Sequence, residues 1–520
     1  MKIIQTTSII FLSFIFLSTR ELHLQAFDNI LGLTSKTLDR RSFPDDFMFG
    51  AASSAYQSEG AVDVDGRKPS IWDTFARQQP EEISDGSNGD VADEFYFRSK
   101  EDVALMKEIG MNSFRFSISW PRILPYGTIG GGVNRAGIDF YNQLIDELIS
   151  NGIKPMATLF HWDLPQALED EYGGFLSRQV VNDYLDYVDL CFKEFGDRVK
   201  YWITVNEPNI FTMFGYGYGM TAPGRCSSYV GNCSAGNSAT EPYLAAHHLI
   251  LSHAAAVRRY RQNYQSSQGG IIGMTIQTSW MIPKYETVAC REAASRALDF
   301  SFGWFANPIT YGEYPEVMRE TVVGERLPKF TREEREMVKG SFDFFGVNYY
   351  TARFTEDAMF YASANLSSTT DSHVNETTEK NGIPIGEPTG ASWLYIYPKG
   401  FQDLLLYVKY KYNNPVIYVT ENGMAYETDK SLPVTEALND ELRIKYHHLH
   451  LSALLNAIRK GADVRGYYVW SFMDDYEWEF GYTNRYGLIY VDFQDNLKRY
   501  LKRSALWYKG FLSMEANSTA

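Results

Sequence analysis

The chain has 520 residues, of which 44% are hydrophobic and 22% are charged, a balance that allows a large buried core. Its formal net charge is -15 and it has no long basic run, which argues against nucleic acid or an anionic membrane surface as the main partner. Aromatic residues reach 15%. Rings in this number often line sites for flat or ringed ligands, although an aromatic-rich core would also account for them.

The N-terminal residues predict a cleaved leader. One Lys precedes an apolar stretch, Ile9 to Leu17, that is too short to span a bilayer. We therefore expect a signal peptide over residues 1–26 and a mature chain, residues 27–520, that enters the secretory pathway. No other stretch approaches ~20 uninterrupted apolar residues, so no membrane anchor is expected. The final "ANSTA" is not an ER-retention signal.

The cysteines and sequons agree with a secreted chain. Cys226 and Cys233 lie in the polar stretch "GRCSSYVGNC", where a disulfide is favoured over a metal pair. Cys191 lies on an apolar helical face and is expected to be buried. Short sequons arise by chance, but four of them predict surface glycosylation at Asn232, Asn365, Asn375 and Asn517.

Eight apolar runs follow one another along the chain, with amphipathic helical stretches between most of them. They alternate little, as expected for strands buried on both faces. In order they are "FMFGAASSAYQ", "SFRFSISW", "IKPMATLFHW", "KYWITVNEP", "GGIIGMTIQTSW", "FDFFGVNYY", "NPVIYVTENG" and "VRGYYVWSF". Strands that alternate with helices imply a parallel sheet, and eight such units predict an α/β fold, a (β/α)8 TIM barrel in a single domain. A doubly wound sheet is the alternative, but no Gly-rich phosphate fingerprint follows the first strand.

Two segments between these runs are predicted to be irregular. The stretch "GYGYGM" has spaced glycines without the Lys of a phosphate loop, so we expect a plain loop. Residues 363–382 are polar and poor in core-forming residues, which predicts a surface excursion rather than a domain boundary.

Polar and aromatic side chains follow the runs on their C-terminal side. The active site of a (β/α)8 barrel lies at that end of its strands, so we expect one shared pocket. A single residue of this kind would more simply be a satisfied core or loop residue, but the coincidence over all the runs favours a site. These residues are Gln57, Arg115, Trp120, His161, Trp162, Asn206, Glu207, Trp280, Asn348, Tyr350, Glu421, Asn422 and Trp470.

Two acids stand out, Glu207 in "VNEP" and Glu421 in "TENG". A buried ion pair with Arg115 is the plain structural explanation, but one Arg cannot neutralise two carboxylates. Two converging acids are typical of glycoside hydrolysis. One acid holds a proton, which burial and a negative neighbour favour, and the other stays ionised, which a nearby Arg favours by lowering its pKa.

The motifs around these residues resemble those of glycoside hydrolase family 1, the β-glucosidases. "TVNEP" and "VTENG" are similar to the family's paired signatures, and the likeness runs from about residue 43 to 512. The leader and the Cys226–Cys233 loop resemble plant members. The resemblance implies one catalytic barrel over residues 27–520 that needs no metal or cofactor and acts on a small-molecule β-glucoside. It also implies delivery to the cell exterior, the cell wall or the vacuole.

The resemblance gives each matching position a role. Glu207 matches the general acid/base and Glu421 the nucleophile of a retaining mechanism through a covalent glycosyl-enzyme. Arg115, Asn348 and Tyr350 are expected to support this pair, and Tyr350 also to face the substrate. The positions that match residues binding the sugar hydroxyls are Gln57, His161, Asn206, Glu477 and Trp478. Trp470 matches the platform beneath the sugar ring, and Trp393 matches a wall of the aglycone subsite.

Branch points within the family narrow the hypothesis. Thioglucosidase-type relatives carry Gln where this chain has Glu207, and Glu477 would repel the phosphate bound by phospho-glycosidase relatives. Ser58 and Glu479-Phe480 depart from the family pattern and leave a disaccharide-glycoside preference open. A transglucosidase on the same site is a further alternative. A catalytically silent sugar-binding protein is the alternative from another class, but both acids are present.

Two histidine clusters resemble metal sites only at first sight. His447, His448 and His450 lie on one amphipathic helical stretch, and the second cluster, His247, His248 and His253, lies on another. Packing and surface roles are favoured for both, and no metal is expected. The sequence leaves the oligomeric state open.

Overall fold

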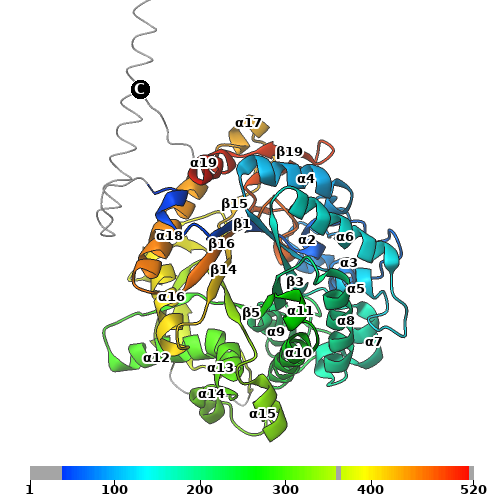
Figure 1. Ribbon diagram of the computed structural model, residues 1–520. Coiled ribbons are helices and arrows are strands. Elements are labelled where there is room, and N and C mark those ends of the chain that lie inside the picture. The colour runs from blue at the N-terminus through cyan, green and yellow to red at the C-terminus, as the bar shows by residue number, and fades with distance from the viewer. Residues whose placement is uncertain (1–37, 359–364, 514–520) are drawn as a thin grey trace, which may run out of the picture.

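The computed structural model describes residues 38–358 and 365–513, so the expected leader and Asn517 lie outside the described residues. Eight parallel strands close into a barrel in the spatial order β1-β16-β14-β7-β5-β4-β3-β2, which confirms the predicted fold class (Figure 1). The strands are β1 (Met48–Ala52), β2 (Ser113–Ser117), β3 (Lys154–Phe160), β4 (Tyr201–Asn206), β5 (Ile271–Gln277), β7 (Phe344–Asn348), β14 (Ile417–Asn422) and β16 (Val464–Trp470).

The barrel strands are buried along almost their whole length, because helices cover one face and the packed interior fills the other. Two of them lose regular pairing close to the predicted acids. The register of β4 against β5 shifts between Ile203 and Asn206, and that of β14 against β7 shifts between Val419 and Glu421. Irregularities of this kind redirect the side chains that follow them. The barrel is therefore least regular where the acids emerge.

Helices surround the strands as an outer ring (Figure 1). In α8 the buried residues recur at helical spacing and include Cys191, as predicted. The longer helices are α4 (Phe95–Ile109), α6 (Arg135–Ser150), α8 (Val180–Phe195), α10 (Glu241–Asn263), α12 (Val288–Leu298), α16 (Pro398–Lys411), α18 (Glu441–Arg459) and α19 (Arg503–Leu512). The shorter ones are α2 (Ala55–Ser58), α3 (Ile71–Gln78), α5 (Trp120–Ile123), α7 (Gln166–Tyr172), α9 (Pro208–Thr212), α11 (Gln265–Gln268), α13 (Trp304–Tyr311), α14 (Glu316–Thr321), α15 (Arg332–Val338) and α17 (Val434–Ala437).

The predicted histidine clusters lie on α10 and α18 and make ordinary packing contacts. His247 Nδ1 lies 2.9 Å from the Tyr314 hydroxyl, and His447 Nδ1 lies 2.8 Å from the Tyr467 hydroxyl. His253 contacts the Thr204 hydroxyl of β4. Within the described ranges, no group of His, Cys, Asp or Glu is arranged to hold a metal ion.

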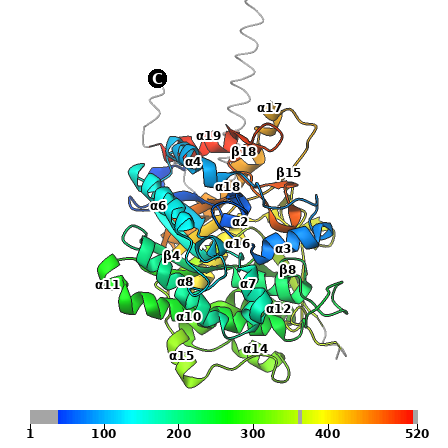
Figure 2. The same ribbon diagram turned by 90° about the vertical axis from the view of Figure 1, so that its right-hand side faces the viewer.

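Smaller strands form separate sheets outside the barrel. In Figure 2 α11, which precedes β5, lies at the left, whereas β8 and β15, which follow β7 and β14, lie at the right. β6 (Trp280–Pro283), β8 (Ala352–Asp357) and β9 (Val374–Thr377) form a three-stranded sheet. Four two-stranded sheets pair β10 (Glu379–Lys380) with β11 (Ile383–Pro384), β12 (Glu387–Pro388) with β13 (Tyr395–Ile396), β15 (Tyr426–Glu427) with β17 (Asn484–Arg485), and β18 (Ile489–Asp492) with β19 (Lys498–Leu501).

The prediction of a plain loop at "GYGYGM" is wrong. Residues 213–218 continue α9 as a π-helix, η4 (Met213–Tyr218), that ends at Gly219. A β-carbon on Gly219 would lie 2.1 Å from the Cys233 sulfur, so the ring closed by Cys226 and Cys233 packs directly against the end of η4. The predicted disulfide is present. The glycines permit this close approach rather than a loop.

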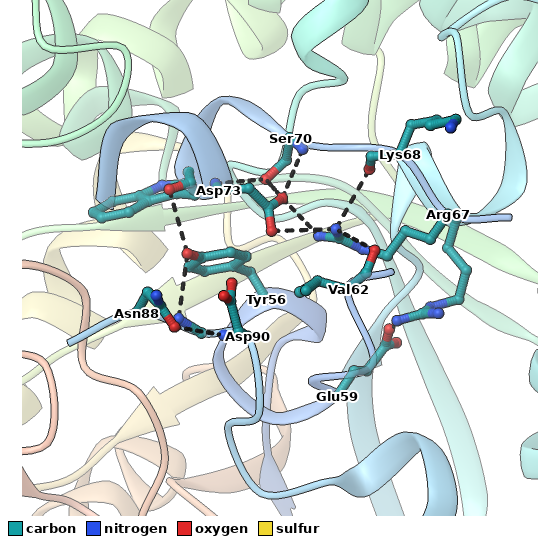
Figure 3. Close-up of polar contacts among 12 residues, drawn as sticks. Tyr56, Glu59, Val62, Arg67, Lys68, Ser70, Asp73, Asn88 and Asp90 are labelled. Carbon is teal, nitrogen blue, oxygen red and sulfur yellow. Dashed lines mark hydrogen bonds and ion pairs between the residues drawn. The ribbon is translucent and has the colours of Figure 1, made fainter. Parts of the chain in front are cut away.

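A buried ion pair fixes the loop between α2 and α3 (Figure 3). Arg67 donates to both carboxylate oxygens of Asp73, at 3.2 and 2.9 Å, and the amide and hydroxyl of Ser70 donate to Asp73 Oδ2 at 2.6 and 2.7 Å. Burial alone would raise the pKa of Asp73, but Arg67 and Ser70 together hold it below its ordinary value. Trp72 follows in α3, and its ring centroid lies 4.6 Å from that of Trp478. The ion pair therefore supports one side of the predicted sugar site.

We expect Arg67→Met to destabilise the fold by about 3–5 kcal/mol, because it leaves the Asp73 carboxylate buried and uncompensated. Arg332→Met is the matched control, since Arg332 pairs with Glu336 on an exposed face of α15. Its effect should stay near about 0.5 kcal/mol. Urea unfolding followed by tryptophan fluorescence measures both changes. Equal shifts of the two midpoints would contradict the structural role of the buried pair.

Candidate active site

A cavity of about 570 Å³ opens at the carboxyl ends of the barrel strands. Its volume is in the range of pockets that enclose small ligands. The structure brings most of the predicted site residues into its wall: His161, Asn206, Glu207, Tyr350, Trp393, Glu421, Trp470, Glu477 and Trp478.

Glu421, near the end of β14, is held at both carboxylate oxygens. Arg115 of β2 donates to Oε1 at 2.5 Å, and the hydroxyl of Tyr350 donates to Oε2 at 2.6 Å. Arg115 has no exposed surface. Its other nitrogens donate to Asn206 Oδ1 at 2.6 Å and to Thr158 Oγ1 at 3.1 Å. This guanidinium therefore links β2 with β3, β4 and, across the barrel, β14, and it orients the Glu421 carboxylate.

Glu207 follows β4 with φ 44° and ψ 54°, in the left-handed region that side chains other than glycine rarely adopt. Its amide donates to the carbonyl of Thr275 in β5 at 2.9 Å, and Pro208 begins α9 directly after it. Pro is favoured at the first position of a helix. The carboxyl Oε1 accepts a hydrogen bond from Asn348 Nδ2 at 2.6 Å. The end of β4, the start of α9 and the hydrogen bond from Asn348 therefore fix the direction of the Glu207 side chain.

The two acids have different proton affinities. Burial and the neighbouring charge of Glu421 raise the pKa of Glu207 well above its ordinary value. Burial also raises the pKa of Glu421, although Arg115 and Tyr350 oppose that rise. Arg115 lowers the pKa of Glu421 as predicted, but desolvation outweighs the guanidinium, so the net pKa lies above its ordinary value. Glu207 still has the stronger hold on a proton, because only Glu421 has a cation at its carboxylate.

Aromatic rings and polar groups line the part of the cavity beside the acids. The ring of His161 stacks at 5.9 Å from Trp470 and at 6.0 Å from Trp478. His161 Nε2 lies 3.0 Å from Asn206 Nδ2. Burial, with Arg115 nearby, lowers the pKa of His161 well below its ordinary value, so its imidazole is neutral. A neutral imidazole can donate one hydrogen bond and accept another, which suits a hydroxyl-bearing ligand.

Six of the residues predicted to share the pocket do not line the cavity. Arg115 and Asn348 hold the two acids from outside its lining, and Asn422 donates to the Tyr349 carbonyl at 2.6 Å. Gln57 is fully buried and lies behind the wall, where its amide is 3.4 Å from Glu477 Oε2. Trp120 stacks on Tyr187 with ring centroids 4.9 Å apart. Trp280 begins β6, a strand outside the barrel, and contacts Tyr407.

The sequence did not indicate much of the outer cavity wall. One part of the lining is apolar and includes Met213, Phe214 and Tyr218 of η4, with Phe300 and Trp304. Another part is more polar and includes Arg353, Glu376 and several hydroxyl side chains. Part of this polar side comes from residues 363–382, which were predicted only as a surface excursion. The Met and aromatic spacing in "MFGYGYGM" was the available signal for the apolar side.

A buried pair of acids at the carboxyl ends of the strands of a closed (β/α)8 barrel is the arrangement expected of a glycosidase. Comparison with known proteins agrees: the family model for Glycosyl hydrolase family 1 matches residues 39–517. The chain therefore belongs to glycosyl hydrolase family 1, as its motifs predicted.

Individual relatives are similar over nearly their whole length. The chain is 74% identical to Beta-glucosidase 17 of Arabidopsis thaliana over 479 residues, which is 92% of each chain. It is 53% identical to an isoflavonoid 7-O-beta-apiosyl-glucoside beta-glycosidase of Dalbergia nigrescens, over 92% of this chain and 86% of that protein. The crystal structure of a rice Os3BGlu6 β-glucosidase superimposes with a TM-score of 0.90 at 50% identity, over 92% of this chain and 100% of that one.

We expect Asn348→Ala to move the alkaline limb of the kcat/KM profile to higher pH. The hydrogen bond from Asn348 favours ionised Glu207 and so lowers its pKa. Without that bond the pKa of Glu207 rises, and an acid that must be protonated stays competent at higher pH.

The pH dependence of kcat/KM for an aryl β-glucoside measures this shift. Asn112→Ala is the control, because Asn112 contacts Phe47 and Phe49 at the opposite end of the barrel. The control can lose stability but should keep the limb in place. If the alkaline limb of Asn348→Ala does not shift, or shifts to lower pH, the assigned contact between Asn348 and Glu207 is contradicted.

Proposed function

We propose that this protein is a retaining β-glucosidase that hydrolyses the O-glycosidic bond of β-D-glucosides with small aglycones. Glu207 is its general acid/base and Glu421 its nucleophile. The observation that carries the proposal is the unequal environment of the two buried acids. Glu421 is oriented at both oxygens by Arg115 and Tyr350, whereas Glu207 has only a neutral amide donor, from Asn348.

In the first step, a carboxylate oxygen of Glu421 attacks the anomeric carbon and the aglycone oxygen leaves. Glu207 gives its proton to that oxygen, so the aglycone departs as a neutral alcohol or phenol. The glucosyl ester on Glu421 has no negative charge. This removes the nearest charge that raises the pKa of Glu207, and the acid becomes a competent base.

In the second step, Glu207 takes a proton from water as the water oxygen attacks the anomeric carbon. The ester bond breaks, Glu421 regains its charge, and glucose leaves with its β configuration kept. Two inversions at one carbon account for the retention. Glu207 thus alternates between acid and base because its neighbour alternates between neutral and charged.

The cavity beside the acids suits a glucose ring. His161, Asn206, Glu477 and Trp478 would bind its hydroxyl groups, and Trp470 would lie beneath its apolar face. Trp393 would contact the aglycone, and Gln57 would act by holding Glu477. Although some relatives are named for disaccharide glycosides, the relative at 74% identity is named a β-glucosidase, so monoglucosides are the proposed substrates.

The proposed route of the protein is the secretory pathway. The sequence pattern of a leader, the disulfide between Cys226 and Cys233, and the exposed sequons Asn232, Asn365 and Asn375 support it. Across the described ranges, no helix is long and apolar enough to cross a membrane.

We expect a 2-deoxy-2-fluoro β-glucoside with an activated leaving group to label Glu421. The fluorine slows both steps, and the good leaving group lets the ester form faster than it hydrolyses. Mass spectrometry of peptides from the labelled protein locates the adduct. A label on Glu207 or on another residue, or binding without any label, would overturn the assignment of the nucleophile.

We expect Glu207→Gln to lower kcat/KM by roughly 10² to 10⁴ for glucosides of alkyl alcohols, because these poor leaving groups need a proton. Glucosides of acidic phenols should lose much less, since they leave as phenolates. A series of aryl and alkyl glucosides measures this dependence. Glu334→Gln is the control, because Glu334 is a buried acid that caps α15 and does not line the cavity. A loss that is the same for every leaving group would refute the acid role.

A further inference from the structure

The polar side of the outer cavity is one face of the sheet β6-β8-β9. Arg353 of β8 pairs in register with Met281 of β6, and Thr355 pairs with Glu376 of β9. Side chains two residues apart on a strand share a face, as do directly paired residues on neighbouring strands. Arg353 and Glu376 therefore lie diagonally on one face, and both line the cavity together with Met281.

The two charged side chains on this inner face have fewer protein partners than those on the outer face. On the outer face Lys284 forms an ion pair with Glu356 at 2.8 Å, and Asn375 donates to the same carboxylate at 2.9 Å. On the inner face the one hydrogen bond of the Arg353 side chain within the described residues goes to the Ala352 carbonyl, at 3.0 Å. The Glu376 carboxyl has no hydrogen-bond or ion-pair partner among the same residues.

The half-buried Arg353 guanidinium thus keeps most of its five N–H donors for another molecule. Desolvation lowers the pKa of Arg353 and raises that of Glu376, and the attraction between the two charges opposes both shifts. Arg353 is half-buried whereas the Glu376 side chain is exposed, so a ligand that accepts hydrogen bonds from Arg353 recovers part of a desolvation cost. The sheet presents a donor and an acceptor side by side toward the aglycone end of the cavity.

The same cavity also has apolar lining, with Phe214 and Tyr218 from η4 and with Phe300 and Trp304. Aromatic walls favour a flat ring by stacking and edge contacts. A hydroxyl group both donates and accepts, so it can satisfy Arg353 and Glu376 together. A carboxylate would meet the like charge of Glu376, and an unsubstituted ring would leave both groups unpaired.

We propose that Arg353 and Glu376 bind a hydroxyl group at the end of a flat aromatic aglycone that lies farthest from the glucose. The preferred substrates are then β-glucosides of polyhydroxylated aromatic compounds. The inference rests on the proposed β-glucosidase function, because it names the substrate class of that same site. Arg353 and Glu376 determine specificity and take no part in bond cleavage.

The test uses three β-glucosides of one two-ring phenol, biphenyl-4-ol, that carry hydrogen, hydroxyl or carboxylate at the far 4′ position. The readout is the ratio of kcat/KM values within each enzyme, so a general loss of folded protein cancels. In the wild-type enzyme kcat/KM for the hydroxyl compound should exceed that for the unsubstituted compound about tenfold or more. This is the ratio expected from one added hydrogen bond to a charged group. The carboxylate compound should be the poorest.

The variants Arg353→Met and Glu376→Gln should bring the hydroxyl-to-hydrogen ratio down toward one. Glu356→Gln on the outer face of the same sheet is the matched control and should keep the wild-type ratio. A wild-type ratio near one, a preference for the carboxylate, or an unchanged ratio in Arg353→Met each overturns the proposal. Hydrolysis of p-nitrophenyl β-glucoside tests the β-glucosidase function separately from the aglycone preference. A wild-type enzyme that does not hydrolyse this compound contradicts the β-glucosidase function itself.

Discussion

One buried guanidinium, that of Arg115, accompanies two buried carboxyls, those of Glu207 and Glu421, and this imbalance of charge governs the site. Arg115 pairs with Glu421, and no second cation contacts Glu207 within the described residues. Two ionised carboxylates beside one cation would leave a net charge in a desolvated pocket, which is costly. A proton on Glu207 removes that charge. The proposed division into acid and nucleophile therefore follows from where the one Arg lies.

The barrel tolerates local strain at the same place. Glu207, Trp162 and Trp478 all have positive φ values, of 44°, 73° and 49°. Each such residue costs of order 1–3 kcal/mol and persists only where its surroundings hold it. Here the indole of Trp162 donates to the Asn206 carbonyl at 2.9 Å, and the ring of Trp162 packs at 4.6 Å from Trp478. The strained residues support one another around the sugar end of the cavity.

The barrel and the acid pair could be predicted because both depend on local sequence. Strands buried on two faces must be continuous apolar runs, and a carboxyl directly after such a run must emerge at the pocket end. Other properties depend on pairing between distant segments. Trp280 misses the pocket because it begins a second strand that pairs with β8. Gln57 lies one layer behind Glu477, and the net pKa of Glu421 depends on a degree of burial that no single stretch of sequence reveals.

The two ends of the cavity also differ in whether barrel strands or other segments build them. The proposed sugar end is built from the ends of barrel strands, which the closed sheet holds in place, and its acids depend on the charge of Arg115. The proposed aglycone end is built from segments that pair mainly among themselves, namely the sheet β6-β8-β9 and the π-helix η4 against the Cys226–Cys233 ring. A side chain can change on these segments without shifting a barrel strand or the charge around Arg115. Chemistry and aglycone preference can therefore vary independently in this fold, because different sets of backbone pairings hold the two ends of one cavity.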